Sequence, residues 1–432
     1  MSVSNCVSWG KNMALLNTAV RSVGTLMIAI VCVGWTAAQA PSHRPVLEQP
    51  RATFTVNPGF RDWGPTVVAG TTIIGGNSSG RGGLFAVDTV TGKLKWTSRL
   101  SGLAHGTPFV STRPAVSGNV VVVPMGNTLT ALSLANGKEL WRGPKTAQNA
   151  TVAADSQAAF VMGDDNTFYA LDAATGRQKW KVTFTQGRGS CYSTPVVRDG
   201  SVYVMGSVEI SPASSRGPAS TYRHLFAFDA NTGEERWRYP AKPAGSRDVC
   251  LTEPVAAEDA LFAVADQTLY AIDRSDGRER WTLEVRRPVE GGVRPVQVSG
   301  LVDAGPVLVG VTSGYLIAFD KATGKTAWEV RGQYRVSAPS TAVAGAVLYF
   351  QGHPGAEPAS EIQDRILYVN GRPVKPVPVL PPGNLNALDL NTRRILWSFS
   401  RPTAEANWPF GFVTPVDGGL WVDSYQALVK LQ

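Results

Sequence analysis

The residue types on which metal binding and catalysis usually depend are scarce in this sequence. It contains 4 cysteines and 4 histidines in 432 residues, and no two histidines stand at the spacing of a metal-ligand pair. The chain also lacks a nucleophile elbow, a phosphate-binding glycine loop and an EF-hand-type calcium loop. Asp164, Asp165 and Asn166 are adjacent, but Asp and Asn are typical of turns. We therefore expect no catalytic residues and no metal site.

Basic residues are not concentrated in any one motif, although the formal net charge is +8. Charged residues make up 17% of the chain and the mean hydropathy is −0.05, values typical of a soluble globular protein. A nucleic-acid-binding chain would carry a basic stripe or motif. We therefore expect no nucleic-acid partner.

Residues 1–40 contain the one sustained apolar run. Lys11 and Arg21 precede the uncharged stretch Val23–Trp35, and Ala-Gln-Ala ends the segment. A basic start, an apolar centre and small residues at the end predict a cleaved signal peptide, and hence a periplasmic or secreted protein without a transmembrane span after processing. Two alternatives stay open. One is an uncleaved anchor, for which the run is short, and the other is lipidation of Cys32, which follows a large valine.

One phrase recurs through the rest of the chain: an apolar strand, Asp, two residues, Thr-Gly, three residues and Trp. Phe168–Trp180, FYALDAATGRQKW, is a clear copy, and there are seven in all. The Asp and Gly predict a tight turn, and the Trp opens a strand and can fill the gap between neighbouring sheets. Ser133 replaces Asp in the second copy and Arg393 replaces Gly in the seventh, so we expect those two turns to be looser. The seven tryptophans are Trp96, Trp141, Trp180, Trp237, Trp281, Trp328 and Trp397.

A second strand pair precedes each copy, as in STPVVRDGSVYVMG at Ser193–Gly206. Each repeat is therefore predicted to be one antiparallel sheet of four strands, A to D. Such sheets bury both faces only by stacking on one another, and radial stacking makes an all-β fold, the β-propeller.

The blade count follows from the strands. Eight A strands can be found but only seven D strands with Trp, so ATFTV (Ala52–Val56) is predicted to supply the eighth and close the last blade. The prediction is an eight-bladed β-propeller at 61–432, preceded by a segment at 41–60 that holds the closing strand. Seven blades is the nearest alternative.

The predicted blades place the Thr-Gly turns on one face, and the D–A and B–C connections on the other. Two long insertions, Ser207–Arg223 and Gly352–Gly383, lie in B–C connections. Because binding commonly resides on loops held by a rigid scaffold, we expect this loop-bearing face to bind an envelope protein or an anionic ligand. Its basic residues favour an anion, although they could equally serve to keep the loops solvated. The candidate binding residues are Arg188, Arg247, Arg294, Arg335, Trp408 and Phe410, of which the last two could instead belong to the core.

Two cysteines follow the predicted signal peptide. Cys191 and Cys250 each stand four residues before the proline of an A strand, Pro195 and Pro254. These are equivalent positions on adjacent blades, and in an oxidising compartment they suggest a disulfide. Two free buried thiols are the alternative.

The AxDxxTGxxxW phrase resembles the repeat of the pyrroloquinoline-quinone (PQQ)-like β-propellers over nearly all of the mature chain. One branch of that family, the quinoprotein alcohol dehydrogenases, uses PQQ with calcium and a disulfide between adjacent cysteines. Cys191 and Cys250 are not adjacent, and the calcium ligands of that branch find no match. The other branch is the non-enzymatic outer-membrane protein assembly factor BamB, whose half-blade ending is similar to FVTPVDGGLWVDSYQALVKLQ. In that family an interblade loop presents an arginine to the partner, and its nearest counterpart here is Gln186–Ser190, around Arg188.

The resemblance implies an exported, monomeric propeller that acts as a binding and assembly scaffold in the cell envelope, without catalysis or a cofactor. A PQQ-dependent alcohol or sugar dehydrogenase is the alternative. A sensor or carrier that binds PQQ or another small anion in a cationic channel is a third.

Overall fold

The structure is a computed structural model, and the chain divides into Met1–Pro41 and Ser42–Gln432. The predicted signal peptide lies outside the described residues, all of which belong to the second unit. Among the described residues no helix is long and apolar enough to cross a membrane. The structure describes residues 44–57, 65–76, 83–98, 113–125, 127–146, 150–185, 194–211, 220–240, 251–265, 267–289, 292–312, 315–334, 341–354, 367–369, 372–374, 384–400, 412–423 and 427–432.

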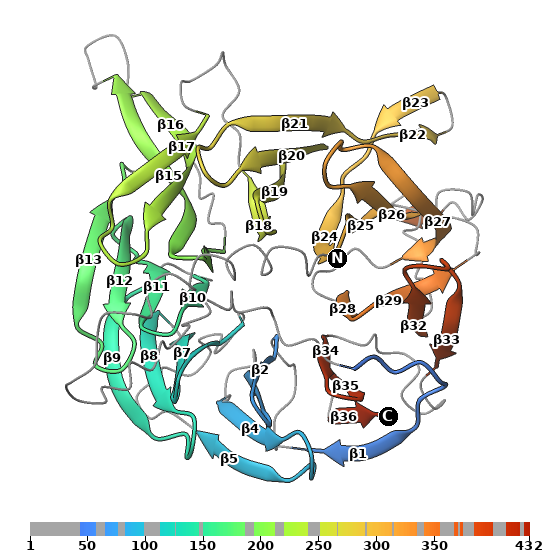
Figure 1. Cartoon of the computed structure of the whole chain (residues 1–432), viewed down its shortest axis with the longest axis horizontal. Helices are drawn as coiled ribbons and strands as arrows, with labels where there is room; N and C mark the ends of the chain where they lie inside the picture. Colours follow the sequence, from blue (N-terminus) through green and yellow to red (C-terminus); the bar gives the residue numbers. More distant parts are fainter. Residues whose placement is uncertain are drawn as a thin grey trace, which may run out of the picture. The chain divides into compact units, whose positions relative to one another are not determined.

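Eight antiparallel four-stranded blades stand in a ring, as predicted (Figure 1). From the inside outwards, blade 1 consists of β2 (Val67–Ala69), β3 (Thr72–Gly76), β4 (Leu84–Asp88) and β5 (Leu94–Ser98). Blade 2 consists of β6 (Ala115–Ser117), β7 (Val120–Met125), β8 (Thr128–Ser133) and β9 (Glu139–Lys145). Blade 3 consists of β10 (Val152–Ala154), β11 (Ala158–Met162), β12 (Thr167–Asp172) and β13 (Gln178–Thr183). Blade 4 consists of β14 (Val196–Arg198), β15 (Ser201–Ser211), β16 (Ser220–Asp229) and β17 (Glu235–Tyr239).

The second half of the ring repeats this order. Blade 5 consists of β18 (Thr252–Ala256), β19 (Ala260–Ala265), β20 (Thr268–Asp273) and β21 (Glu279–Glu284). Blade 6 consists of β24 (Ser299–Ala304), β25 (Val307–Thr312), β26 (Tyr315–Asp320) and β27 (Thr326–Tyr334). Blade 7 consists of β28 (Ala342–Ala344), β29 (Val347–Pro354), β32 (Asn384–Asp389) and β33 (Ile395–Phe399). Blade 8 consists of β34 (Val413–Val416), β35 (Gly419–Asp423), β36 (Leu428–Leu431) and β1 (Ala52–Val56). Two small hairpins lie outside the blades: β22 (Arg286–Val289) with β23 (Gly292–Pro295), and β30 (Leu367–Val369) with β31 (Arg372–Val374).

Contacts between the inner strands of successive blades close the ring around its axis. Each inner strand contacts the inner strand of the next blade, and β34 of blade 8 contacts β2 of blade 1. The middle strands carry the core because both of their faces are covered by neighbouring sheets, so they run apolar rather than alternating. All five residues of β11 are buried, for example, whereas β14 on the inside is only half-buried.

The tryptophan of the outer strand docks each blade on its neighbour. In six of the seven repeats the indole Nε1 donates a hydrogen bond of 2.8–3.0 Å to a backbone carbonyl across the seam. The indole also covers the turn glycine of the next repeat. In five cases a Cβ added to that glycine would lie 2.5–2.7 Å from the indole. At these six seams the indole lies between neighbouring blades. The hydrogen-bonded pairs are Trp96–Leu134, Trp141–Ala173, Trp180–Ala230, Trp237–Arg274, Trp281–Lys321 and Trp397–Val46.

The N-terminal strand closes blade 8, as predicted. β1 pairs antiparallel with β36, with Thr55 opposite Val429. This strand has no tryptophan, and Phe54 takes its place. The phenyl ring covers Gly92 of blade 1, where a Cβ would lie 2.6 Å away.

Residues 44–50 take the place of the turn that blade 8 lacks between its third and fourth strands. Arg44 forms an ion pair of 2.8 Å with Asp417 in the first turn of blade 8. The amide of Val46 donates to the Tyr349 hydroxyl (2.8 Å), and its carbonyl accepts from Trp397 (3.0 Å). The segment therefore provides Trp397 with the carbonyl that a next-blade turn provides elsewhere.

The seam between blades 6 and 7 is built differently. Trp328 makes no indole hydrogen bond, although all seven tryptophans are described. The turn that it faces holds Arg393 at a φ of 62° in place of glycine. Instead, the ends of β27 and β29 pair with each other, Gln333 opposite His353, and join the two blades into one sheet.

The expectation of looser turns in the two variant repeats is wrong. The Arg393 amide donates to the Asp389 carbonyl at 2.7 Å, and the Gly137 amide donates to the Ser133 carbonyl at 2.8 Å. The other five turns have the same bond at 2.8–3.0 Å. The backbone bond that closes the turn therefore survives both replacements.

Candidate binding site in the axial cavity

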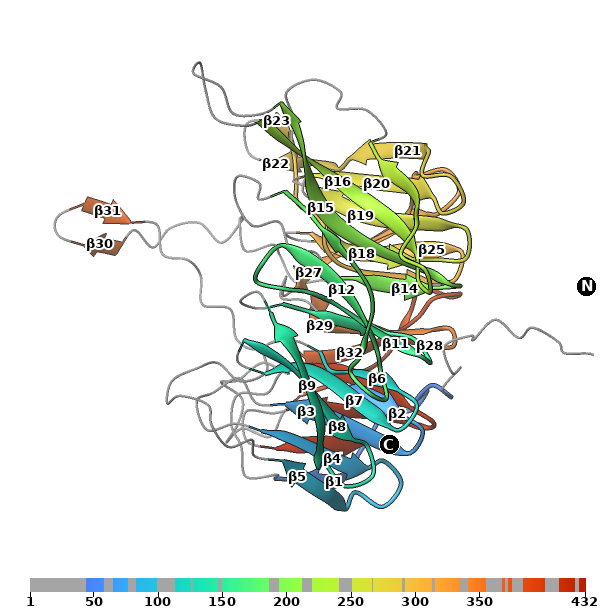
Figure 2. The same cartoon turned by 90° about the vertical axis from the view of Figure 1, so that its left-hand side faces the viewer.

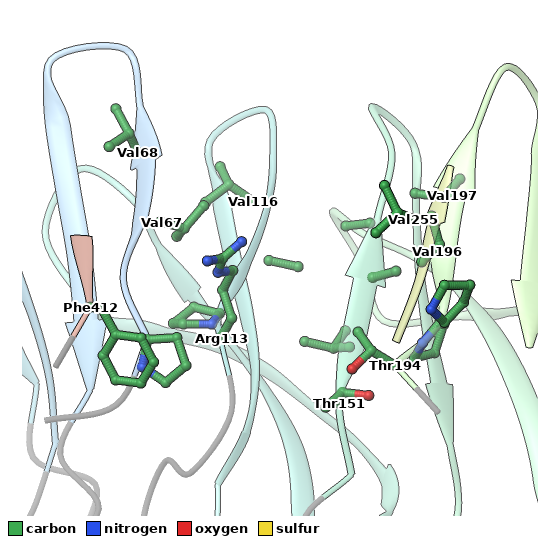
Figure 3. Close-up of a pocket in the computed structure, with 18 of the residues that line it drawn as sticks. Val67, Val68, Arg113, Val116, Thr151, Thr194, Val196, Val197, Val255 and Phe412 are labelled. Carbon is green, nitrogen blue, oxygen red and sulfur yellow. The ribbon is translucent and has the colours of Figure 1, made fainter. Parts of the chain in front are cut away.

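A cavity of about 690 Å³, open to solvent, lies at the ring axis and is lined by inner strands (Figure 3). Blades 1 to 5 supply most of its wall. Leu301 comes from blade 6, and Phe412 directly precedes the first strand of blade 8. The inner strands are short, and they are half-buried because they lie between the core and the axis. Their apolar side chains border the cavity and also pack against the core between the blades.

The wall has two chemically different ends. Four wall residues stand four positions before the last residue of their inner strand, so they lie at one level along the ring axis, which we call a tier. They are Pro65, Arg113, Thr194 and Phe412. Figure 3 shows Arg113 and Phe412 on one side and Thr151 with Thr194 on the other. The tiers nearer the hairpin turns hold valine and alanine, namely Val67, Val68, Ala115, Val116, Val152, Ala153, Ala154, Val196, Val197 and Val255.

Arg113 is the charged residue of the described cavity wall, and no acidic residue lines it. The rest of the described wall is mostly apolar, and the cationic channel stays a prediction. Sequence reasoning missed Arg113, although its place directly before the A-strand proline Pro114 is a signal that could have found it. Chemically, this wall can desolvate an apolar body and orient one anionic group.

The family model of the outer membrane protein assembly factor BamB matches residues 33–203 and 222–364 of the chain. These ranges cover most of the propeller. The chain belongs to the BamB family.

Curated relatives of this BamB-family chain differ in what they do. It is 28% identical over 253 residues to BamB of Burkholderia pseudomallei, covering 54% of this chain and 58% of that protein. It is 29% identical over 179 residues to the serine/threonine-protein kinase AfsK of Streptomyces griseus, covering 40% of this chain and 20% of the kinase. The chain thus spans less than two-thirds of the length of either relative.

The fold extends to solved enzymes. The quinohemoprotein alcohol dehydrogenase of Comamonas testosteroni superposes with a TM-score of 0.55 at 15% identity, covering 89% of this chain and 77% of that one. At that identity the likeness shows the shared propeller fold and nothing further.

Most of the sequence-predicted site residues lie outside the part of the BamB-family chain that the structure describes. This holds for five of the six candidate binding residues and for both cysteines, so their proximity and the disulfide stay predictions. They are Arg188, Arg247, Arg335, Trp408 and Phe410, together with Cys191 and Cys250. Arg294 is described and lies exposed on β23.

The β22–β23 hairpin that carries Arg294 lies in the connection from blade 5 to blade 6. Arg286 pairs with Glu284 at 2.6 Å, and Arg287 pairs with Glu329 at 2.7 Å while lying over the Tyr315 ring. Arg287 therefore links the hairpin to blade 6, whereas the Arg286–Glu284 pair is local to the chain. Beside Arg294, Val293 is 58% exposed, so these two neighbouring residues present a cation and an apolar side chain to solvent.

Asp164, Asp165 and Asn166 form a turn, as expected. The Asp165 carboxylate accepts from the Thr167 amide (3.0 Å) and the Tyr169 hydroxyl (2.7 Å). Among the described residues no group of three His, Cys, Asp or Glu side chains could hold a metal ion.

The turn-bearing face is occupied by structural contacts between blades 4 and 5. The Arg274 side chain is 9% exposed and bonds to Asp199 (3.0 Å) and to the Tyr203 hydroxyl (3.1 Å). It also donates to the Ala257 carbonyl at 3.0 Å. This arginine therefore ties two blades together and offers no donor to an outside ligand.

Proposed function

We propose that this chain is an exported, non-catalytic scaffold of the cell envelope that binds another envelope protein through its loop-bearing face. The match to the BamB family model over most of the propeller carries the proposal. The sequence of residues 1–40, with its basic start and apolar centre, supports export. Membership of the outer membrane protein assembly factor BamB family supports an envelope partner connected with outer-membrane protein assembly.

The asymmetry of the ring supports the choice of face. Figure 2 shows the β22–β23 and β30–β31 hairpins on the left-hand side of the ring, opposite the short turns between paired strands. The β15–β16 extension, the β22–β23 hairpin and the β30–β31 hairpin all belong to the longer connections. A rigid ring with variable loops on one side is the usual arrangement of a binding scaffold.

The alternative, a PQQ-dependent dehydrogenase, rests on the quinoprotein enzymes that share the fold. PQQ is a planar tricarboxylate, and burying three anionic groups requires several cations or donors. The described cavity wall offers one guanidinium, two hydroxyls and otherwise apolar side chains. These residues do not fit PQQ, and no catalytic step is assigned to the cavity.

Photo-crosslinking tests the scaffold proposal with a matched pair of positions. Val293 on the β22–β23 hairpin is 58% exposed, and Val90 in a turn on the opposite face is 63% exposed. A benzophenone amino acid at position 293 of the full-length protein in its own cells should give discrete adducts, identified by mass spectrometry as an envelope protein. The same substitution at position 90 should give none.

Equal labelling from both positions, or none from either, would contradict a partner on the loop-bearing face. A titration of the purified protein with PQQ and calcium, followed by a dye-linked alcohol assay, tests the alternative. Saturable binding with turnover would replace the scaffold proposal by an enzyme.

A further inference from the structure

Exposed apolar side chains are not spread evenly around the ring. Six large apolar side chains of the described residues are at least 37% exposed, and Val293 on the loop-bearing face is one of them. The other five lie on the turn-bearing side of blades 7, 8, 1 and 2, whose outer strands β33, β1, β5 and β9 follow one another around the ring (Figure 1). We call these five residues the rim arc; they are Leu47, Val90, Leu94, Leu140 and Ile395.

The repeat itself shows that the fold does not require these side chains to be apolar. Leu94 and Ile395 stand two residues before the tryptophan of their blade, and Leu140 stands one residue before it. At these two positions blade 3 has Gln and Lys, blades 4 and 5 have Glu and Arg, and blade 6 has Thr and Ala. All three apolar side chains are exposed at the start of their outer strand, so they contribute little to the core. A contact outside the propeller explains them better.

Cations accompany the rim arc. The residue three positions before the tryptophan is Lys93 in blade 1, Lys138 in blade 2 and Arg394 in blade 7, and all three are exposed. Within the described part of the chain none of them forms an ion pair. Each of these three blades therefore presents a cation within two residues of an exposed apolar side chain.

Acidic side chains do not cancel this charge. Asp88 and Asp389 accept hydrogen bonds within their own turns, and Glu139 forms an ion pair of 2.8 Å with Arg142. Of the acids on this part of the rim, Glu48 alone has no partner among the described residues. The rim arc is therefore both apolar and positively charged.

We propose that the rim arc lies on an anionic phospholipid membrane. Apolar side chains of a peripheral protein enter the boundary between headgroups and acyl chains, while neighbouring cations attract anionic lipid. The course of the chain supports this occupant. Arg44 pairs with Asp417 in the first turn of blade 8, at the middle of the rim arc, and the apolar run Val23–Trp35 ends nine residues earlier. Nine extended residues span at most about 30 Å, so a membrane that receives this run lies within reach of the rim arc.

The opposite part of the same rim does not suit an anionic surface. In blade 4 the position that holds a cation in the rim arc is Glu234, and Glu235 follows it, both exposed. The ring is therefore tilted, with blades 7, 8, 1 and 2 at the membrane and blades 3 to 6 away from it. The loop-bearing face stays open to a protein partner.

The experiment measures co-sedimentation of the chain from residue 41 onwards with phospholipid vesicles. Ser42–Gln432 is a compact unit, and without the apolar run the binding reports on the propeller. Vesicles with about 40% phosphatidylglycerol in phosphatidylcholine should bind the protein at least about tenfold more tightly than pure phosphatidylcholine. Binding should weaken as the salt concentration rises from about 0.05 to 0.5 M, because exposed charges are then screened.

Two triple variants distinguish the rim arc from general charge. The rim variant combines Lys93→Gln, Lys138→Gln and Arg394→Gln. The control combines Arg177→Gln, Arg278→Gln and Lys325→Gln, which are exposed cations at the equivalent position in blades 3, 5 and 6. Both variants lose the same net charge. The rim variant should bind anionic vesicles at least about tenfold more weakly, since one cation near such a surface contributes about fivefold, and the control should change by less than about threefold.

A third variant tests the apolar part. Leu94→Gln, Leu140→Gln and Ile395→Gln together should weaken binding at least about tenfold, because side chains that leave water on the membrane are lost. This loss should persist at high salt, unlike that of the rim variant. All substituted side chains are exposed, so an unchanged melting temperature checks that each variant is folded.

Equal losses in the rim variant and its control would overturn the proposal, because general attraction would then account for the binding. So would a lack of co-sedimentation at about 1 mM anionic lipid, or full binding by the apolar variant. A discrete protein adduct from a benzophenone amino acid at position 94 in cells would instead make the rim arc a protein interface. Crosslinking from position 293 should persist in all three variants, so failure of this proposal is distinguishable from failure of the scaffold proposal.

Discussion

Gly176 and Gly200 permit a direct measurement of how much tryptophan docking stabilises the ring. Both glycines have positive φ, +73° and +70°. A Cβ on Gly176 would lie 2.7 Å from the Trp141 indole, whereas a Cβ on Gly200 would meet nothing within 4 Å. Alanine at the two positions therefore imposes the same backbone strain, but only at position 176 does it displace the indole.

The expected difference follows from three contributions. Left-handed backbone costs an alanine about 1–2 kcal/mol at either position. At position 176 the displaced ring adds about 1–3 kcal/mol of overpacking. Loss of the Trp141 hydrogen bond to the Ala173 carbonyl, 3.0 Å long, adds about 1 kcal/mol. Gly200→Ala should thus lower the free energy of unfolding by about 1–2 kcal/mol, and Gly176→Ala by about 2–4 kcal/mol more.

Urea unfolding followed by tryptophan fluorescence and circular dichroism measures both variants against the wild type. The midpoint should fall further for Gly176→Ala without a change in slope, because the surface exposed on unfolding is unaltered. In a thermal scan each 1 kcal/mol corresponds to about 1–2 °C for a domain of this size. Equal losses in the two variants would refute the docking argument, because the indole would then contribute nothing at this seam.

Three further predictions concern the same ring. Arg393→Gly should raise the free energy of unfolding by about 1 kcal/mol in urea titrations by removing left-handed strain, and a destabilised variant would show that the arginine side chain contributes to the seam. Deleting residues 41–60 should sharply lower the melting temperature, because blade 8 loses β1, and an unchanged melt would contradict closure by this strand. A hydrogen bond from Ser275 and the nearby Arg280 lower the pKa of Asp273 to about 2. Its stabilising contribution is therefore complete above about pH 4 and lost as the pH falls to about 2. Asp273→Asn should flatten the fall of the urea midpoint in that window, and an unchanged profile would refute its role.

The repeat predicts almost the whole fold because its spacing encodes both local and interblade geometry. In the six phrases that have an Asp, its carboxylate accepts hydrogen bonds in its own turn, as Asp172 does from Thr175. The Gly and the Trp of successive phrases then meet across the seam. Even the closing strand at Ala52–Val56 could be predicted, since a missing outer strand must be supplied by an unpaired apolar segment elsewhere in the chain.

The residues that line the cavity could not be predicted in the same way. Its wall uses valine and alanine, the same residues that a buried strand would have, and sequence alone does not distinguish a side chain facing the axis from one facing a neighbouring blade. For Arg113 the sequence offers its place directly before the A-strand proline Pro114, and register then places it in one tier with Thr194 and Phe412. The charge of the basic loops, in contrast, is visible in the sequence itself.

The seam between blades 6 and 7 lacks the contact between tryptophan and turn glycine that other seams of the ring have. At Arg393 the glycine that admits an indole is gone, and Trp328 lacks the hydrogen bond that its six counterparts make. At this same seam β27 and β29 extend beyond the blades and pair at Gly332–Tyr334 and Gly352–Pro354. Stability in such rings comes from each blade and its contacts with neighbours, so a weakened side-chain contact can be offset by backbone hydrogen bonds between the same two blades. The pairing also joins the end of β29, after which the β29–β32 insertion begins, to β27 of blade 6.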